Sequence, residues 1–115
     1  MPKYLLLLRD SGEFPAGLGA DEIRGIIQRY VAWSDRLRAA GRLLAAEKLR
    51  DGEGRVMRRT GSRNGVTDGP FSEAKEVVGG FYLLDAGSYE EAVRLAEDSP
   101  HLEFGSIEIR EIESL

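Results

Sequence analysis

Apolar residues fall into short segments along the chain, and their spacing alternates between the periods of strands and helices. Residues 4–8 (YLLLL) form an apolar run that stops at charge, which predicts a buried strand. The glycine-rich residues 11–19 predict a loop. Apolar side chains then recur at helical spacing over about five turns and predict a long helix ending at Gly41, where a left-handed cap is favourable. This stripe contains Ile23, Ile26, Ile27, Tyr30, Trp33, Leu37 and Ala40.

The rest of the chain predicts several strands and one further helix. Residues 42–50 could extend the long helix, but Gly41 favours a break and we expect a strand there. Between turns at 51–54 and 61–65, residues 55–60 predict an edge strand. Its charged side chains hinder pairing of the exposed edge with another chain. Residues 77–85 are the most strand-like, and Gly79-Gly80 indicates a bulge or a closely packed backbone. A capping box at 88–91 opens a short helix that Pro100 ends, and residues 106–112 alternate like a half-buried strand.

This order of elements predicts one α+β domain over residues 1–115. Two βαβ units with an added hairpin, βαββ(β)αβ, fold as a ferredoxin-like antiparallel sheet with both helices on one face when their crossovers have the usual hand. The other face of such a sheet is left bare. Apolar residues on it need cover, and a second copy of the chain is the usual solution, so we expect a homodimer.

Composition and charge limit the classes of partner. The 115 residues are 42% hydrophobic and 31% charged, without cysteine, which excludes disulfides and Cys-ligated zinc. No segment approaches 18 apolar residues, so we expect a cytoplasmic protein without a membrane span. Residues 1–63 carry a net charge of +5 and residues 64–115 one of −9. No aromatic residues interleave with the arginines, which argues against direct nucleic-acid binding. The asymmetry instead suggests that two copies pack basic half to acidic half.

The stretch 66–76, VTDGPFSEAKE, holds the main candidates for a functional site. Asp68 stands beside Gly69-Pro70, where its carboxylate could act at a cleft edge or could simply form an Asx turn. Glu73 is a further candidate catalytic residue. Lys75 and Glu76 could bind a polar ligand with Glu73 or form exposed ion pairs. Phe71 is expected to fill the core or a dimer interface, and it is also a candidate ligand-binding residue.

Three residues elsewhere complete the candidate site. Tyr30 belongs to the helix stripe, so core packing competes with a catalytic role there. His101, the only histidine, follows Pro100; an exposed or capping position is the plainer interpretation and ligand binding the alternative. Arg110 could bind a ligand carboxylate or pair with Glu76, Asp68 or Glu108. With one histidine and no cysteine, no transition-metal site is expected, and no cofactor-binding motif is present.

The block VTDGPFSEAKE, followed by Gly79-Gly80-Phe81, Glu91-Ala92 and residues 105–110 (GSIEIR), resembles the DGPF proteins of the YCII-related family over nearly the whole chain. The resemblance implies a bacterial, cytoplasmic, dimeric α+β barrel. It also implies acid–base or lyase-type chemistry on a small molecule in a cleft near the DGPF motif. The alternative is a non-catalytic ligand-binding or regulatory module associated with a sigma factor.

The sequence departs from the family at the pair of residues to which catalysis is attributed. That pair is a histidine on the first helix and an aspartate before a proline. Here Tyr30 or a neighbour occupies the histidine turn, and Ser99 precedes Pro100 with Asp98 adjacent. A tyrosine has an ordinary pKa of about 10, so it needs a strongly perturbed environment to act as a base near pH 7.

Overall fold

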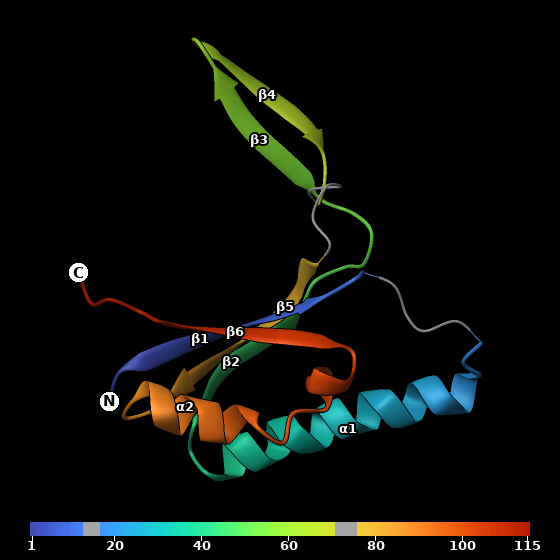
Figure 1. Cartoon of the computed structure of the whole chain (residues 1–115), viewed down its shortest axis with the longest axis vertical. Helices are drawn as coiled ribbons and strands as arrows, with labels where there is room; N and C mark the ends of the chain where they lie inside the picture. The colour runs from blue at the N-terminus through green and yellow to red at the C-terminus, as the bar shows by residue number, and fades with distance from the viewer. Residues whose placement is uncertain (13–16, 71–75) are drawn as a thin grey trace.

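The computed structural model describes residues 1–12, 17–70 and 76–115 (Figure 1). The predicted order of strands and helices is confirmed, with one strand more than the sequence indicated. In chain order the elements are β1 (Lys3–Asp10), α1 (Ala20–Ala39), β2 (Leu43–Lys48), β3 (Arg55–Thr60), β4 (Arg63–Asp68), β5 (Val77–Asp85), α2 (Tyr89–Ala96), the 3-10 helix η1 (Pro100–Glu103) and β6 (Gly105–Glu111).

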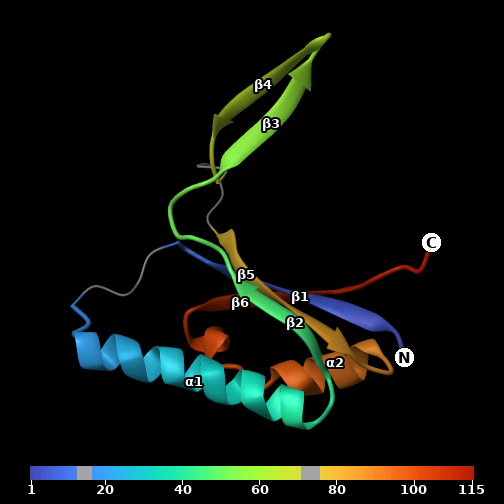
Figure 2. The same ribbon diagram turned by 180° about the vertical axis from the view of Figure 1, so that it is seen from behind.

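The main sheet has four antiparallel strands in the order β2-β5-β1-β6. Figures 1 and 2 show both helices on the same face of this sheet. The arrangement is compatible with the predicted ferredoxin-like α+β fold. On the open face, Leu5 pairs with Leu83 and Leu7 with Phe81, and all four side chains are only partly buried. The homodimer and the dimeric barrel inferred from that face stay predictions.

The core lies between the sheet and the two helices. Trp33 of α1 is fully buried, its ring centroid 4.3 Å from that of Tyr82, and its indole Nε1 donates to the carbonyl of Leu95 at 3.2 Å. Burial of aromatic and aliphatic side chains is the main stabilising term in a domain of this size. The buried apolar residues are Tyr4, Leu6, Leu8, Trp33, Leu37, Tyr82, Leu84, Ala86, Ala92 and Ala96.

Local signals in the sequence correspond to the ends of both helices and to the glycine pair. Gly41 adopts φ +73° just beyond α1, and the Ser88 hydroxyl accepts from the backbone N–H of Glu91 at 3.1 Å at the start of α2. The register of β1 against β5 shifts opposite Gly79, and a Cβ on Gly80 would come within 2.9 Å of the Glu47 carbonyl oxygen. The glycine pair therefore serves both predicted purposes, a bulge and a close backbone approach.

The segment 55–68 differs from the expectation. We predicted a turn over 61–65, but the turn is confined to Gly61-Ser62, and residues 63–68 form β4. β3 pairs with β4 in a separate two-stranded sheet rather than at an edge of the main one. Strand β4 is exposed along its whole length. Its sequence therefore lacks the alternation of apolar and polar residues by which half-buried strands are predicted.

Candidate functional site

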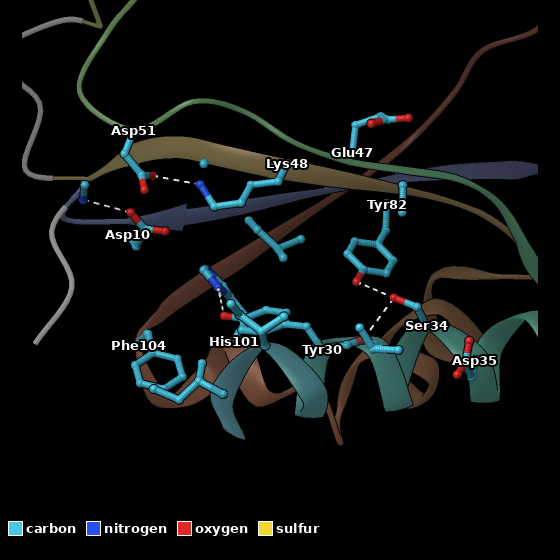
Figure 3. Close-up of a pocket in the computed structure, with 18 of the residues that line it drawn as sticks. Asp10, Tyr30, Ser34, Asp35, Glu47, Lys48, Asp51, Tyr82, His101 and Phe104 are labelled. Carbon is cyan, nitrogen blue, oxygen red and sulfur yellow. Dashed lines mark hydrogen bonds and ion pairs between the residues drawn. The ribbon is translucent and has the colours of Figure 1, made fainter. Parts of the chain in front are cut away.

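A cavity of about 470 Å³ lies between α1 and the helix-facing side of the sheet (Figure 3). Most of its wall is apolar, and hydroxyl groups, one imidazole and several charged side chains supply the polar positions. Pockets that bind small organic molecules usually have this size and composition. The residues that line it are Leu8, Asp10, Gly12, Ile26, Ile27, Tyr30, Val31, Ser34, Asp35, Arg38, Ala46, Glu47, Lys48, Asp51, Gly79, Gly80, Tyr82, His101 and Phe104.

His101 is buried at the edge of this cavity, with only 3% of its surface exposed. The expectation of an exposed histidine was wrong, because η1 turns the ring inward beneath β1. Its Nε2 lies 2.8 Å from the carbonyl oxygen of Arg9, and its Nδ1 lies 2.9 Å from the Tyr30 hydroxyl. A carbonyl oxygen can only accept, so Nε2 carries a hydrogen. In the neutral imidazole Nδ1 then accepts the Tyr30 proton, and the tautomer is fixed.

The chain around His101 holds the ring in this position. Ser99 caps η1 by accepting the backbone N–H of His101 at 3.2 Å, and Pro100 occupies the first turn. On the other side of the ring, Gly105 pairs with Asp10 at the start of β6. A Cβ at position 105 would collide with the carbonyl oxygen of Arg9. Glycine there allows β6 to approach β1 closely and leaves the Arg9 carbonyl free to accept from His101.

Tyr30 supplies the hydroxyl that connects the imidazole to the cavity (Figure 3). Burial, and secondarily the carboxylate of Asp10, raises the pKa of Tyr30 to about 12. At pH 7 about one phenol in 10⁵ is therefore ionised, so Tyr30 is a neutral donor. A free tyrosinate cannot serve as the base of this site at neutral pH. Proton transfer through Tyr30 requires that its own proton has a destination, and Nδ1 of His101 is the group that it contacts.

A second pair of hydroxyl groups fixes the adjacent wall. Ser34 donates to the backbone carbonyl of Tyr30, one helical turn earlier, at 2.9 Å. Its oxygen also lies 2.7 Å from the Tyr82 hydroxyl. Because the single hydrogen of Ser34 is already used, Tyr82 donates to Ser34. Burial raises the pKa of Tyr82, so this group too stays neutral at physiological pH.

The charged side chains around the cavity have partners within the protein. Lys48 lies 2.9 Å from Asp51, and Arg38 lies 3.0 Å from Asp35. The Asp10 carboxylate accepts the backbone N–H of Gly12 at 2.7 Å. Glu47 borders the cavity, but Figure 3 shows its side chain directed away from it. Lys48, Arg38 and Asp10 are thus already compensated, and the uncharged polar groups at the cavity are mainly hydroxyls.

The other predicted site residues do not gather at this cavity. Asp68 lies at the end of β4, where its side chain is 93% exposed and 3.4 Å from Arg55. Arg110 is 70% exposed on β6 and lies 3.6 Å from Glu108, the only one of its three predicted partners that an ion pair brings to it. Glu76 accepts from the hydroxyl of Ser106 at 2.9 Å. None of these three lines the cavity. Phe71, Glu73 and Lys75 lie outside the described residues, and the functional roles predicted for all six stay predictions.

Sequence reasoning selected Tyr30 and His101 separately but did not pair them. Seventy-one positions separate the two, so no local spacing relates them. It also missed Ser34 and Tyr82, which appeared as an ordinary helix residue and an ordinary strand residue. The one available signal was the Ser-Pro-His sequence at 99–101, because a capped turn that starts with proline holds the next side chain in a fixed direction.

The described residues contain neither a cluster of metal ligands nor a helix suited to cross a membrane. No group of three or more His, Asp or Glu side chains lies close enough together to hold a metal ion in that part of the chain. Among the helices of the described ranges, none combines the length and the apolar character that a bilayer-spanning helix needs.

Comparisons with known proteins agree with the family resemblance. An uncharacterized protein of Rhizobium meliloti (strain 1021) is 36% identical over 89 residues, which cover 73% of this chain. The aligned region is 65% of that relative's own length, so slightly less than two thirds of it is matched. The model of the YCII-related domain matches residues 3–115, nearly the entire chain. The protein therefore belongs to the YCII-related family.

Proposed function

We propose that the cavity binds a small organic molecule and that Tyr30 and His101 together transfer a proton to or from it. The observation that supports this is a continuous set of hydrogen bonds, from the Arg9 carbonyl through both ring nitrogens of His101 to the Tyr30 hydroxyl at the cavity wall. A buried structural histidine also needs a donor for Nδ1; what favours proton transfer here is that this donor is a hydroxyl facing the cavity. The arrangement matches a common catalytic pattern, in which the group facing the ligand is oriented by a second residue. Here Tyr30 would face the ligand, and His101 with the Arg9 carbonyl would orient it.

In the proposed step, the oxygen of Tyr30 accepts a proton from the ligand while its phenolic proton moves to Nδ1 of His101. The resulting imidazolium keeps its Nε2–H on the Arg9 carbonyl, which stabilises the positive charge. Return of the proton to a different atom of the ligand completes an isomerisation. Departure of a leaving group before that return completes an elimination. Imidazole suits this role because one ring nitrogen can accept the proton while the other keeps its hydrogen bond.

The wall of the cavity favours a neutral ligand with an apolar body. Lys48 and Arg38 already have carboxylate partners, so neither is an unpaired cation for an anionic ligand. Because the hydrogen of Tyr30 is already used on His101, a ligand must instead present a hydrogen to the Tyr30 oxygen, and apolar contact with residues such as Ile26 and Phe104 contributes hydrophobic stabilisation. Aldehydes and ketones with acidic C–H bonds next to the carbonyl fit both requirements.

The test uses a panel of small aldehydes and ketones dissolved in D₂O. We expect the wild-type protein to accelerate exchange of the hydrogens next to the carbonyl, followed by proton NMR. Tyr30→Phe should slow that exchange by about 100-fold or more, the usual contribution of a positioned acid–base group. Broadening of the probe resonances measures binding separately and should persist in Tyr30→Phe. Binding without accelerated exchange would support the alternative, a non-catalytic ligand-binding module. Absence of binding would refute the choice of ligand class.

The role predicted for Asp68 can be tested in the same assay. Asp68→Asn keeps the shape of the side chain and removes its charge. If the site centres on Tyr30 and His101, exchange and binding should be unchanged, since Asp68 does not line the cavity. A loss of exchange would restore the DGPF segment as part of the site. A regulatory role with a sigma factor is the corresponding proposal if the cavity binds ligands without transforming them.

A further inference from the structure

Strands β3 and β4 form an arm, residues 55–68, that stands away from the sheet and helices (Figures 1 and 2). Its two strands pair with each other from Arg55–Asp68 at the foot to Thr60–Arg63 near the tip. Every residue of the two strands is exposed except Val56, which is partly buried. A two-stranded hairpin is marginally stable on its own in water, so the arm needs a surface to lie against.

The surface area of the chain indicates how much cover is missing. The chain exposes 8202 Å², whereas a compact monomer of 12.7 kDa exposes about 6200 Å². Its radius of gyration is 16.2 Å, compared with about 13 Å for a compact domain of this length. The excess of about 2000 Å² is larger than the roughly 800 Å² that each partner buries in a standard stable interface.

One face of the arm has the composition of an interface. Met57 and Val66 are directly opposed on it and are 67% and 57% exposed. Arg59, hydrogen-bonded to Asn64 at 2.9 Å, lies beyond them on the same face, and the Arg55–Asp68 ion pair lies at the foot. An exposed apolar pair bordered by arginines is typical of a contact centre in a protein–protein interface.

Charge complementarity favours a second copy of this chain as the partner of the arm. The arm carries a net charge of +3, and the remainder of the chain carries −7. Exposed or partly exposed carboxylates lie at the end of the sheet away from the foot of the arm, where Lys3 pairs with Asp85 and Tyr4 with Glu111. Glu90 and Glu113 follow closely in sequence and are exposed. In a two-fold dimer whose sheets face each other with strands antiparallel, the foot of one arm lies over this acidic end of the other copy.

We propose that the β3–β4 arm is an intersubunit arm, which lies on the acidic end of the sheet of a second copy of this chain. The exchange is reciprocal, so each copy both extends an arm and receives one. Met57 and Val66 supply the buried apolar centre of the contact, and Arg59 with its neighbours pairs with carboxylates such as Glu113. The contact does not involve the cavity, so the test of the arm is independent of the test of the proposed proton transfer.

The test measures the dimer dissociation constant by sedimentation equilibrium. The double substitution Met57→Asp and Arg59→Glu should raise the dimer dissociation constant at least about 10-fold, as expected for loss of a central contact. Arg24→Glu on α1 changes one exposed charge of the same kind and should leave the constant within about twofold. Arg59→Glu combined with Glu113→Arg should recover affinity relative to either single substitution, because the pair of charges is exchanged.

A second measurement reports on the arm itself. Hydrogen exchange of the backbone amides of residues 55–68 should be slow in the dimer and fast after dilution to monomer, because the isolated arm is only marginally stable. Trp33 fluorescence verifies that each variant is folded. Three results would overturn the proposal: a monomer at millimolar concentration, a dimer whose arm amides exchange freely, or an arm variant that dimerises as tightly as wild type.

Discussion

The substitution Tyr30→Phe tests the assignment of the histidine tautomer directly. It removes one hydroxyl group and leaves the aromatic ring, so the packing around α1 is kept. What it takes away is the donor that lies 2.9 Å from Nδ1 of His101. Because Nε2 already donates to the Arg9 carbonyl, the ring cannot satisfy Nδ1 by changing tautomer without breaking that second bond.

The expected cost follows from the burial of His101, which exposes 3% of its surface. A buried acceptor left without a donor costs about 1–3 kcal/mol. Unfolding entropy of about 2.1 cal/mol/K per residue makes 1 kcal/mol equivalent to about 4 °C in Tm for a chain of 115 residues. We therefore expect Tm to fall by about 4–12 °C. The lower end applies if a water molecule enters the cavity and donates to Nδ1.

The assay takes advantage of the single histidine, which gives one pair of ring nitrogen signals in ¹⁵N-histidine-labelled protein. In the neutral imidazole of the wild type we expect a protonated Nε2 and an unprotonated Nδ1. Tyr30→Phe should move the Nδ1 signal most, because that nitrogen loses its donor. Tyr4→Phe is the matched control: it removes a tyrosine hydroxyl that bonds Glu111 at 3.3 Å, at the other end of the sheet. A protonated Nδ1 in wild type, or equal responses to the two substitutions, would refute the reasoning.

Three further predictions concern the stability of the fold and the orientation of His101. Since the pKa of Tyr30 is raised to about 12 from 10, its neutral form stabilises the fold below pH 10, and that contribution disappears as pH rises from 10 to 12. Wild type should lose about 1–2 kcal/mol more than Tyr30→Phe across that window, after allowance for partial exposure, as urea titrations at each pH can show; parallel curves would contradict it. Gly105→Ala should displace the Arg9 carbonyl and shift the Nε2 signal of His101, whereas an unchanged spectrum would mean that β6 adjusts elsewhere. Ser88→Ala should cost about 1 kcal/mol through loss of the α2 cap, measured by thermal unfolding, and a neutral result would show that solvent replaces the cap.

The fold was predictable because its signals are local. The apolar run of β1, the helical stripe of α1 and the Ser88 cap each lie within one element, and the order of the elements restricts the topology to few choices. Strand β4 could not be found in this way. It has no buried face, and its pairing with β3 comes from backbone hydrogen bonds that any sequence can make.

The candidate site was predicted less well, for a related reason. Asp68 and its neighbours stand out in the sequence because they are grouped, whereas His101 and Tyr30 meet only when η1 folds back under β1. For the single histidine, the sequence favours an exposed or capping position, with ligand binding as the alternative. Its partners are a backbone carbonyl and a phenol, and neither is distinguishable in a sequence from the many other carbonyls and tyrosines of a protein.

The use of the Arg9 main-chain carbonyl to orient His101 has a consequence for divergence within the family. Every amino acid has this carbonyl, so no substitution at position 9 can delete the acceptor itself. The side chains that shape the cavity can therefore vary while the orientation of the imidazole is preserved. Relatives that keep the histidine, the tyrosine and the glycine at 105 could differ in their cavity residues yet retain the same Tyr–His hydrogen bond, so comparing those cavity residues would show how far the cavity varies around a fixed imidazole.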